Sequence, residues 1–242
     1  MPLIVPANEQ GAGFMAAGYS RASGKVGVAM VTSGPGITNC VTPVRDCMAD
    51  SIPIVVISGQ VPTGAIGSDA FQEAPVSGIM GACAKHVFLV TDATKLEATV
   101  RTAFHIARSG RPGPVVIDIP KDVQNWQGIF QGQGLLPIPG YQQRLAAVEN
   151  NTLSAAQCEE FAKLFGKSKR PLIYAGGGVV LGEASAALTT FAQAFGIPVV
   201  QTLMGLGGYD TTDNLALHML GMHGAAFANY AVEDCDFVLA VG

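Results

Sequence analysis

Residues 8–39 read NEQGAGFMAAGYSRASGKVGVAMVTSGPGITN, and this stretch decides the fold class. Residues 10–23 are rich in small side chains and predict a helix that packs closely against its neighbours. Residues 26–32 predict a strand without polar alternation, which is typical of a parallel sheet covered on both faces. A Gly34-Pro35-Gly36 turn then leads into a second helix. This order of helix, buried strand, turn and helix indicates an α/β fold.

Glu9 is the only charged residue ahead of Arg21. One interpretation is an acid near the start of a helix, where the helix dipole favours it and Asn8 caps the first turn. The other is an acid that meets a ligand or a polar group, because an isolated carboxylate among small apolar residues must be either solvated or paired. The residues alone leave both interpretations open.

The same alternation of strands and helices continues along the chain. Before residue 122 the pattern predicts a short strand at 2–6, helices at 37–49 and 92–109 (the latter capped by Asp92), strands at 53–58, 84–90 and 115–119, and a long polar loop at 59–73. After residue 153 it predicts helices at 154–166, 183–196 and 225–232, and strands at 172–175, 198–202 and 236–241. Residues 123–152 are rich in Gln, Gly and Pro and predict a linker.

We therefore expect two successive three-layer domains with parallel sheets, at residues 1–122 and 153–242. The second domain is expected to be Rossmann-like and incomplete, because the last predicted strand ends where the sequence ends. The first is expected to lack its start, because its opening helix has little sheet before it.

The composition limits the function classes. The chain has 242 residues, of which 49% are apolar and 13% charged, and its net charge is −4. Such weak, dispersed charge does not favour nucleic acid. No apolar run reaches the roughly 18 residues of a membrane span, and no signal-peptide pattern is present. The five cysteines form no CxxC pair, which is typical of reduced thiols inside a cell.

Three features could serve a ligand at the carboxyl edge of a sheet. The glycine-rich turns at 34–36 and 176–178 would let backbone approach a ligand closely, although such turns are common. Lys121 follows a strand that ends in proline, so it either faces an anionic substrate or is solvated.

The 59–73 loop carries Phe71 and Gln72, a pair that suits either a pocket rim or an ordinary surface loop. His218 and His223 lack the spacing and the neighbours of a metal site, so we expect no metal ligands here. From the residues alone we therefore expect a phosphate-bearing ligand, but no particular reaction.

Read together, several segments resemble the thiamine-diphosphate-dependent enzymes, and most closely the acetolactate synthase (acetohydroxyacid synthase) family. The segments are NEQGAGFMAAGYSRASGKVGV, VTSGPGITN, DSIPIVVISGQVP, GSDAFQE, GRPGPVVIDIPKDVQ, YAGGGV, TLMGLGGYD and LGMHGAAFANYAVEDCD, and they cover nearly the whole chain. GRPGPVVIDIPKD is shared across much of the superfamily, whereas GSDAFQE and MGLG with LGMHG point to acetolactate synthase. The resemblance implies a pyrimidine-binding first domain and most of a central, FAD-binding second domain.

The resemblance also implies roles for the candidate catalytic residues. Glu9 would hydrogen-bond a ring nitrogen of the cofactor's aminopyrimidine and so promote deprotonation of the thiazolium carbon, work that suits a buried carboxylate. Gln72 and Phe71 would shape the site near the cofactor and the second substrate, and Lys121, with Pro62, would line the access channel. Cofactor contacts would also come from Gly34 and, for FAD, from Ser51, Arg111, Gly177, Gly178, Thr202, Leu203, Leu220, Gly221, Met222 and His223.

The implied reaction is decarboxylation of pyruvate and addition of the remaining unit to a second 2-keto acid, pyruvate or 2-ketobutyrate. This is the first step of branched-chain amino-acid biosynthesis. The implied cofactors are thiamine diphosphate, Mg²⁺ and a largely structural FAD. The implied assembly is a homodimer or homotetramer with the active site between two subunits, and a small regulatory subunit is a possible partner. The implied location is the cytoplasm, or a plastid or mitochondrion in a eukaryote.

Two departures from the family pattern stand out. The family usually has His before the catalytic Glu, where this chain has Asn8. The GDG…N motif, which in the family holds diphosphate and Mg²⁺ in a third domain, does not occur in these residues, so we expect them to be inactive alone. The rival hypotheses are another thiamine-diphosphate enzyme (a pyruvate oxidase, oxalyl-CoA decarboxylase or aldehyde lyase) and a non-catalytic nucleotide-binding module that uses the 176–178 turn.

Overall fold

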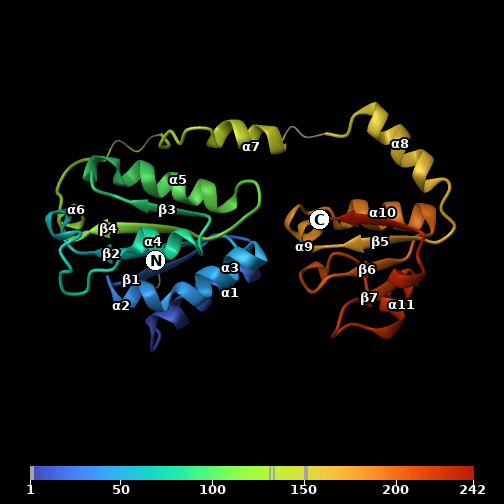
Figure 1. The fold of residues 1–242 in the computed structure, drawn as a ribbon, viewed down its shortest axis with the longest axis horizontal. Helices are drawn as coiled ribbons and strands as arrows, with labels where there is room; N and C mark the ends of the chain where they lie inside the picture. Colours follow the sequence, from blue (N-terminus) through green and yellow to red (C-terminus); the bar gives the residue numbers. More distant parts are fainter. Residues whose placement is uncertain (1–2, 131, 133, 150–151) are drawn as a thin grey trace. The chain divides into compact units, whose positions relative to one another are not determined.

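A computed structural model describes residues 3–130, 132, 134–149 and 152–242. The chain divides into two compact units, residues 1–151 and 152–242, and each is described here by itself. Both contain a parallel four-stranded sheet, so the predicted α/β fold with two successive parallel sheets is confirmed (Figure 1). Among the described residues, no helix is both long and apolar enough to cross a membrane.

The sheet of the first unit has the strand order β1-β2-β4-β3. Its strands are β1 (Gly27–Val31), β2 (Ile54–Gln60), β3 (His86–Leu89) and β4 (Val115–Pro120). The helices of this unit are α1 (Glu9–Ser23), α2 (Pro35–Asn39), α3 (Val41–Asp50), α4 (Val76–Gly81), α5 (Leu96–Arg108), α6 (Lys121–Gln124) and α7 (Tyr141–Glu149), with 3-10 turns η1 (Thr63–Ala65) and η2 (Ala93–Lys95).

Helices cover the two faces of this sheet and make three layers (Figure 1). Successive side chains of a strand point to opposite faces. Ile54 and Val56 of β2 therefore pack in one core with α1, α2, α3 and α4, whereas Val55 packs in the other with α5 and α6. Strand β4 is buried along its whole length, which explains its unbroken apolar sequence except for Asp118.

The edge strand β1 departs from the sequence prediction. We expected it to be buried on both faces, but Val28 and Met30 alternate outward, and Met30 is 65% exposed. The prediction was wrong because local hydrophobicity does not reveal which strand lies at the edge of a sheet.

Other elements also differ from their predicted bounds. Residues 3–6 form no strand, and the rest of the predicted strand at 2–6 lies outside the described residues. The helix predicted at 37–49 is two helices, α2 and α3, which meet at Cys40. Helix α4 was not predicted at all, because its six residues VSGIMG are too few to show a helical period. Asp92 caps η2 rather than the helix that follows it.

Part of the predicted linker at 123–152 is ordered on the first unit. Tyr141 begins α7, and its hydroxyl lies 2.6 Å from Ser109 Oγ at the end of α5. The amide of Leu136 donates to Thr102 Oγ1 at 2.8 Å, and Leu145 is buried. These side chains lie against α5, so the Gln- and Pro-rich composition here reflects a surface strap and not an unstructured tether.

The second unit has the strand order β7-β6-β5-β8. Its strands are β5 (Pro171–Ala175), β6 (Val199–Gln201), β7 (Ala216–Met219) and β8 (Phe237–Val241), and its helices are α8 (Ala155–Phe165), α9 (Gly177–Leu181), α10 (Ser185–Phe195) and α11 (Ala226–Asp234), with a 3-10 turn η3 (Leu203–Gly205). Ile173 and Val199 pack toward α9 and α10, and Leu172 and Val200 pack toward α11. These are again three layers (Figure 1).

The sequence predicted the bounds of some elements of the second unit better than those of others. Ser154 forms a complete capping box with Gln157 at the start of α8, as its sequence position indicates. The helix predicted at 183–196 begins at Ser185, and the 176–178 turn continues directly into α9. Strand β7 was missed, because residues 216–219 carry a histidine and border a glycine-rich loop.

Candidate functional site

The carboxyl ends of the parallel strands in the first unit meet at one edge of the sheet, where ligands of α/β proteins bind. Helix α1 precedes β1 and packs against it, so its first turn also lies at this edge. The 33–36 turn follows β1, the 61–74 loop follows β2, and Lys121 follows β4. Candidate residues far apart in the sequence therefore lie at one edge.

Glu9 stands in the first turn of α1. Asn8 caps this helix by accepting a hydrogen bond from Gly11 N at 2.8 Å, as predicted. Glu9 Oε2 accepts a hydrogen bond from Asn39 Nδ2 at 2.9 Å. This bond and the local backbone hold the pKa of Glu9 below its ordinary value, so the carboxylate is ionised at neutral pH. Glu9 is half-exposed and not buried, so the burial that the resemblance implied is not met within this single chain.

The backbone conformation and the close packing at position 34 both require glycine. Its φ is +57°, and a Cβ there would lie 2.7 Å from the carbonyl oxygen of Gln72. The backbone of the 61–74 loop thus rests directly on this turn. The structure explains Gly34 by contact within the chain, without requiring a ligand.

The 61–74 loop presents its candidate residues outward. Phe71 is 89% exposed and Gln72 is exposed. Asp69 and Gln72 adopt positive φ angles of 59° and 60°, which non-glycine residues rarely do. Glu73 stabilises this conformation by accepting hydrogen bonds from the amides of Gly67 and Ala70. Loops held in such unfavourable backbone conformations are often binding or catalytic loops.

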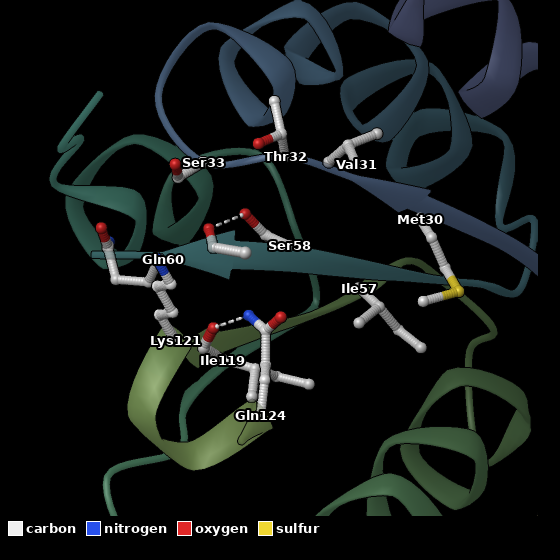
Figure 2. A pocket seen from close by; sticks show the side chains of 11 residues that line it. Met30, Val31, Thr32, Ser33, Ile57, Ser58, Gln60, Ile119, Lys121 and Gln124 are labelled. Atoms are coloured by element: carbon white, nitrogen blue, oxygen red, sulfur yellow. Dashed lines mark hydrogen bonds between the residues drawn. The ribbon is translucent and has the colours of Figure 1, made fainter. Parts of the chain in front are cut away.

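A cavity of about 400 Å³ opens beside β1 and β2. Figure 2 shows Gln60 and Lys121 at one end of it and the apolar side chains of Met30 and Ile57 at the other. The full lining is Met30, Val31, Thr32, Ser33, Ile57, Ser58, Gly59, Gln60, Ile119, Lys121 and Gln124. Glu9, Phe71 and Gln72 are not part of this lining. The chain by itself therefore brings Lys121 to the same edge as these residues without joining them in one pocket.

The sequence analysis missed a buried polar pair at this edge. Gln60 Nε2 donates to Asp118 Oδ2 at 3.0 Å, and both side chains are buried. Burial raises the pKa of Asp118 to about 6, although hydrogen bonds from Gln60 and Ser58 oppose the shift. The available signal was an acid inside the otherwise apolar run VVIDIP, where an unpaired carboxylate would be unfavourable.

Ser51 and Arg111 meet at the opposite edge of this sheet, where β2 and β4 begin. Arg111 Nε donates to Ser51 Oγ at 2.8 Å, and its terminal nitrogen donates to the carbonyl oxygens of Met48 and Ala49. Ser51 itself ends α3 with a φ of +61°. The guanidinium thus caps α3 and satisfies carbonyl groups that the helix leaves free.

The other predicted flavin residues gather at the carboxyl edge of the second sheet. They follow β5 (Gly177 and Gly178), β6 (Thr202 and Leu203) and β7 (Leu220, Gly221, Met222 and His223). Thr202 Oγ1 accepts from Gly205 N at 3.0 Å, and Asn229, which the sequence analysis missed, bonds both backbone groups of Gly221. Met222 is 92% exposed. The edge therefore combines fixed backbone turns with an outward apolar surface.

The glycines of this edge are packed against backbone. A Cβ on Gly205 would lie 2.4 Å from the carbonyl oxygen of Ala175, and one on Gly178 would lie 2.6 Å from the carbonyl carbon of Gly242. These turns contact one another so closely that larger residues would separate them. In the part of the chain that the structure describes, no group of three or more His, Cys, Asp or Glu side chains could hold a metal ion.

Comparison with known proteins agrees with this geometry. Residues 1–79 match the family model described as the N-terminal TPP binding domain of thiamine pyrophosphate enzymes, and residues 158–242 match the model of their central domain. The chain is 47% identical over 239 residues to acetolactate synthase 2, chloroplastic, of Nicotiana tabacum. It is 45% identical to acetolactate synthase, chloroplastic, of Arabidopsis thaliana and to the acetolactate synthase large subunit of Corynebacterium glutamicum.

Each of these alignments covers 99% of this chain but only 35% to 37% of the relative. The chain thus spans about a third of the length of the curated relatives that it matches.

Proposed function

The chain belongs to the thiamine pyrophosphate enzymes, and from this premise we propose that it forms the N-terminal and central domains of an acetolactate synthase catalytic subunit. The observation that carries the proposal is the sequence identity of 45% to 47% over almost the whole chain to proteins of that name. The arrangement of Glu9, Gly34 and the 61–74 loop at one sheet edge supports it. The proposed reaction joins two 2-keto acids with loss of carbon dioxide, and pyruvate is the first of them.

The geometry around Glu9 suits a carboxylate that partners a nitrogen heterocycle. Glu9 Oε2 accepts a hydrogen bond from Asn39, and among the described residues no hydrogen bond is made to Glu9 Oε1. A half-exposed, ionised oxygen is able to accept a proton or a hydrogen bond from a ring nitrogen placed against it. When bound, thiamine diphosphate supplies a nucleophilic carbon and an electron sink for decarboxylation of the keto acid.

The other residues of this edge would receive the substrates. Lys121 is a solvent-exposed cation at the mouth of the cavity, where it would attract the carboxylate of a 2-keto acid. Phe71 and Gln72 would contact the second keto acid, since an exposed ring and an amide offer an apolar surface and a hydrogen-bonding group.

FAD would bind the second unit along the turns after β5, β6 and β7. The exposed Leu203 and Met222 offer apolar surface for a flat ring system, and the fixed turn at Gly221 offers backbone groups. The role of Ser51 and Arg111 at the flavin is also part of the proposal, although Arg111 already caps α3. We propose that Mg²⁺ and the diphosphate are held by the third domain of the family; among the described residues, no group of three or more His, Cys, Asp or Glu side chains could hold a metal ion.

The assembly is proposed as a homodimer or homotetramer, with a small regulatory subunit as a possible further partner. Glu9, Phe71 and Gln72 all lie open on the single chain, as expected if a second copy completes the site. The relatives include chloroplastic, mitochondrial and bacterial proteins, and we propose the cytoplasm or such an organelle as the location.

The test is Glu9→Gln in the complete protein supplied with thiamine diphosphate, Mg²⁺ and FAD. The amide keeps the size of the side chain but accepts no proton, so kcat for acetolactate formation should fall by roughly 100-fold or more. Wild-type protein should form acetolactate from pyruvate without hydrogen peroxide, which separates it from an oxidase.

Glu159→Gln is the matched control, because Glu159 is exposed on α8 of the other unit, and its rate should stay within about twofold of wild type. Unchanged carboligation in Glu9→Gln would refute the role of this acid. A wild-type protein that makes no acetolactate would refute the activity itself.

A further inference from the structure

Asp118 is a buried acid that the proposed chemistry does not use. It is 1% exposed and lies in β4 between Ile117 and Ile119. Because side chains alternate along a strand, it points to the same face as Val116, toward the core with α1 and α4. It is absent from the lining of the cavity. A carboxylate buried in such a strand is unfavourable unless hydrogen-bonding partners compensate for the lost water.

Its partner Gln60 connects three parts of the first unit. Gln60 Nε2 donates to Asp118 Oδ2 and to the carbonyl oxygen of Ala74, both at 3.0 Å. Gln60 Oε1 accepts from the amide of Val61 at 2.8 Å. Val61 and Ala74 are the first and last residues of the 61–74 loop. One buried side chain therefore ties both ends of this loop to each other and to β4.

The acid determines which way the Gln60 amide points. An ionised carboxylate only accepts hydrogen bonds, and so does the carbonyl of Ala74, whereas the amide of Val61 only donates. With Asp118 in place, Nε2 must face the two acceptors and Oε1 must face Val61. Ser58, the neighbour of Asp118 in β2, lies 2.8 Å from the carbonyl oxygen of Gly59 and is a second partner of the acid, but Gln60 is the partner that also contacts the loop.

The loop needs such support. Asp69 and Gln72 hold positive φ angles, and the Gln72 backbone rests on Gly34. Residues in these conformations revert to ordinary ones unless their surroundings hold them. The exposed contacts of the loop help, since Asp122 accepts from both the amide and the hydroxyl of Thr63. Only Gln60 joins the beginning of the loop to its end among the bonds found in the described chain.

We infer that Gln60 and Asp118 are positioning residues, which hold the 61–74 loop in the conformation that presents Phe71 and Gln72. The effect on the reaction rests on the function proposed above, because it assumes that these two residues meet the second keto acid. The effect on loop order does not depend on that function. The two consequences can therefore be measured separately.

The experiment is done in the complete protein. It replaces the Gln60 amide by a carboxylate of the same size, and then the Asp118 carboxylate by an amide. Gln60→Glu places two acceptors against each other and removes the donor to Ala74. Hydrogen exchange at the amides of Val61, Gly67 and Ala70 should become at least tenfold faster. The KM for the second keto acid should rise at least fivefold.

Adding Asp118→Asn to Gln60→Glu restores a donor facing an acceptor, and it should recover at least half of the lost protection on a logarithmic scale. A residue that only fills space would show no such rescue. Gln193→Glu is the matched control, because Gln193 Nε2 also donates to an aspartate, Asp213 Oδ2 at 2.7 Å, but on the exposed surface of the second unit. It should leave loop exchange and KM within twofold of wild type.

Exchange within twofold of wild type in Gln60→Glu, or a double variant no better than the single one, would overturn the inference. Faster exchange with an unchanged KM would also overturn it as stated, since the loop would then not govern the second substrate. If the wild-type protein forms no acetolactate, the proposed function fails, and the exchange data still decide whether the pair holds the loop.

Discussion

The two sheets each have four parallel strands, but their strand orders differ and their carboxyl edges are built differently. In the first unit, hydrogen bonds of polar side chains fix the edge. Asn39 donates to Glu9, Gln60 donates to Asp118, and Glu73 accepts from the backbone of its own loop. In the second unit, backbone packs on backbone, as at Gly205 against Ala175. The first edge therefore controls charge and proton position, whereas the second controls shape. The proposed function would use this division, with proton transfer at the first edge and flavin binding at the second.

The largest expected effect tests the construction of the second edge. Gly205→Ala would place a methyl group 2.4 Å from the carbonyl oxygen of Ala175, and backbone cannot move aside cheaply. We expect a loss of about 3 kcal/mol in local stability. Hydrogen exchange of the slow amides in β5 and β6 measures it, and the amides of β2 and β4 should be unchanged.

Gly207→Ala is the control, because Gly207 has open space around it and only its φ of +91° opposes a side chain. It should cost about 1 kcal/mol. Equal losses for the two substitutions would mean that close packing does not shape this edge.

A smaller effect tests the buried acid of the first edge. The pKa of Asp118 is raised to about 6, so the folded state binds a proton more tightly than the unfolded state does. The free energy of unfolding should therefore fall by at most about 3 kcal/mol as pH rises from about 4 to 6, and this contribution should be level above pH 6. In Asp118→Asn this slope should disappear.

Urea unfolding of the 242-residue chain, followed by fluorescence, measures this slope, because Trp126 is its single tryptophan and lies in the first unit. Besides burial, hydrogen bonds from Gln60 and Ser58 act on this pKa and lower it. A slope that persists in the variant would assign it to another group and weaken the contrast between the edges.

The smallest effect concerns the control of Glu9. Its hydrogen bond from Asn39 is the main reason that its pKa lies below the ordinary value. In Asn39→Ala the pKa should rise toward that value, and the acid side of the rate–pH profile of the complete protein should move to higher pH. Asn214→Ala, an exposed amide of the second unit, should leave the profile in place. An unmoved profile in Asn39→Ala would show that the polar contacts do not control this acid.

The sequence predicted which residue types belong to the candidate site better than it predicted which of them lie in contact. Glu9, Phe71, Gln72 and Lys121 stand out as an acid, a ring, an amide and a cation near predicted strand or helix ends. Their roles remain predictions, and the chain by itself leaves Lys121 in a cavity that the other three do not line. The reason is that alternation of strands locates an edge, whereas the separation of side chains along that edge depends on loops without a period.

Gly34 and Arg111 show a second limit of prediction from sequence, because residues predicted to contact a ligand have structural roles. A ligand contact was predicted for Gly34 from its glycine-rich turn and for Arg111 from the family resemblance, and both have tasks inside the fold, one against Gln72 and one at the end of α3. A glycine that admits a ligand and a glycine that admits the chain's own backbone look alike in sequence. Only the neighbouring atoms distinguish them.

The sequence by itself determined the class of the fold and the starts of several helices. Period, glycine turns and caps such as Asn8 and Ser154 act over a few residues, so they can be read along the chain. Only the tertiary structure decided that β1 is an edge strand and that Gln60 meets Asp118, 58 residues away. Such contacts depend on strand order and register, which arise when the sheet assembles and which no local pattern encodes.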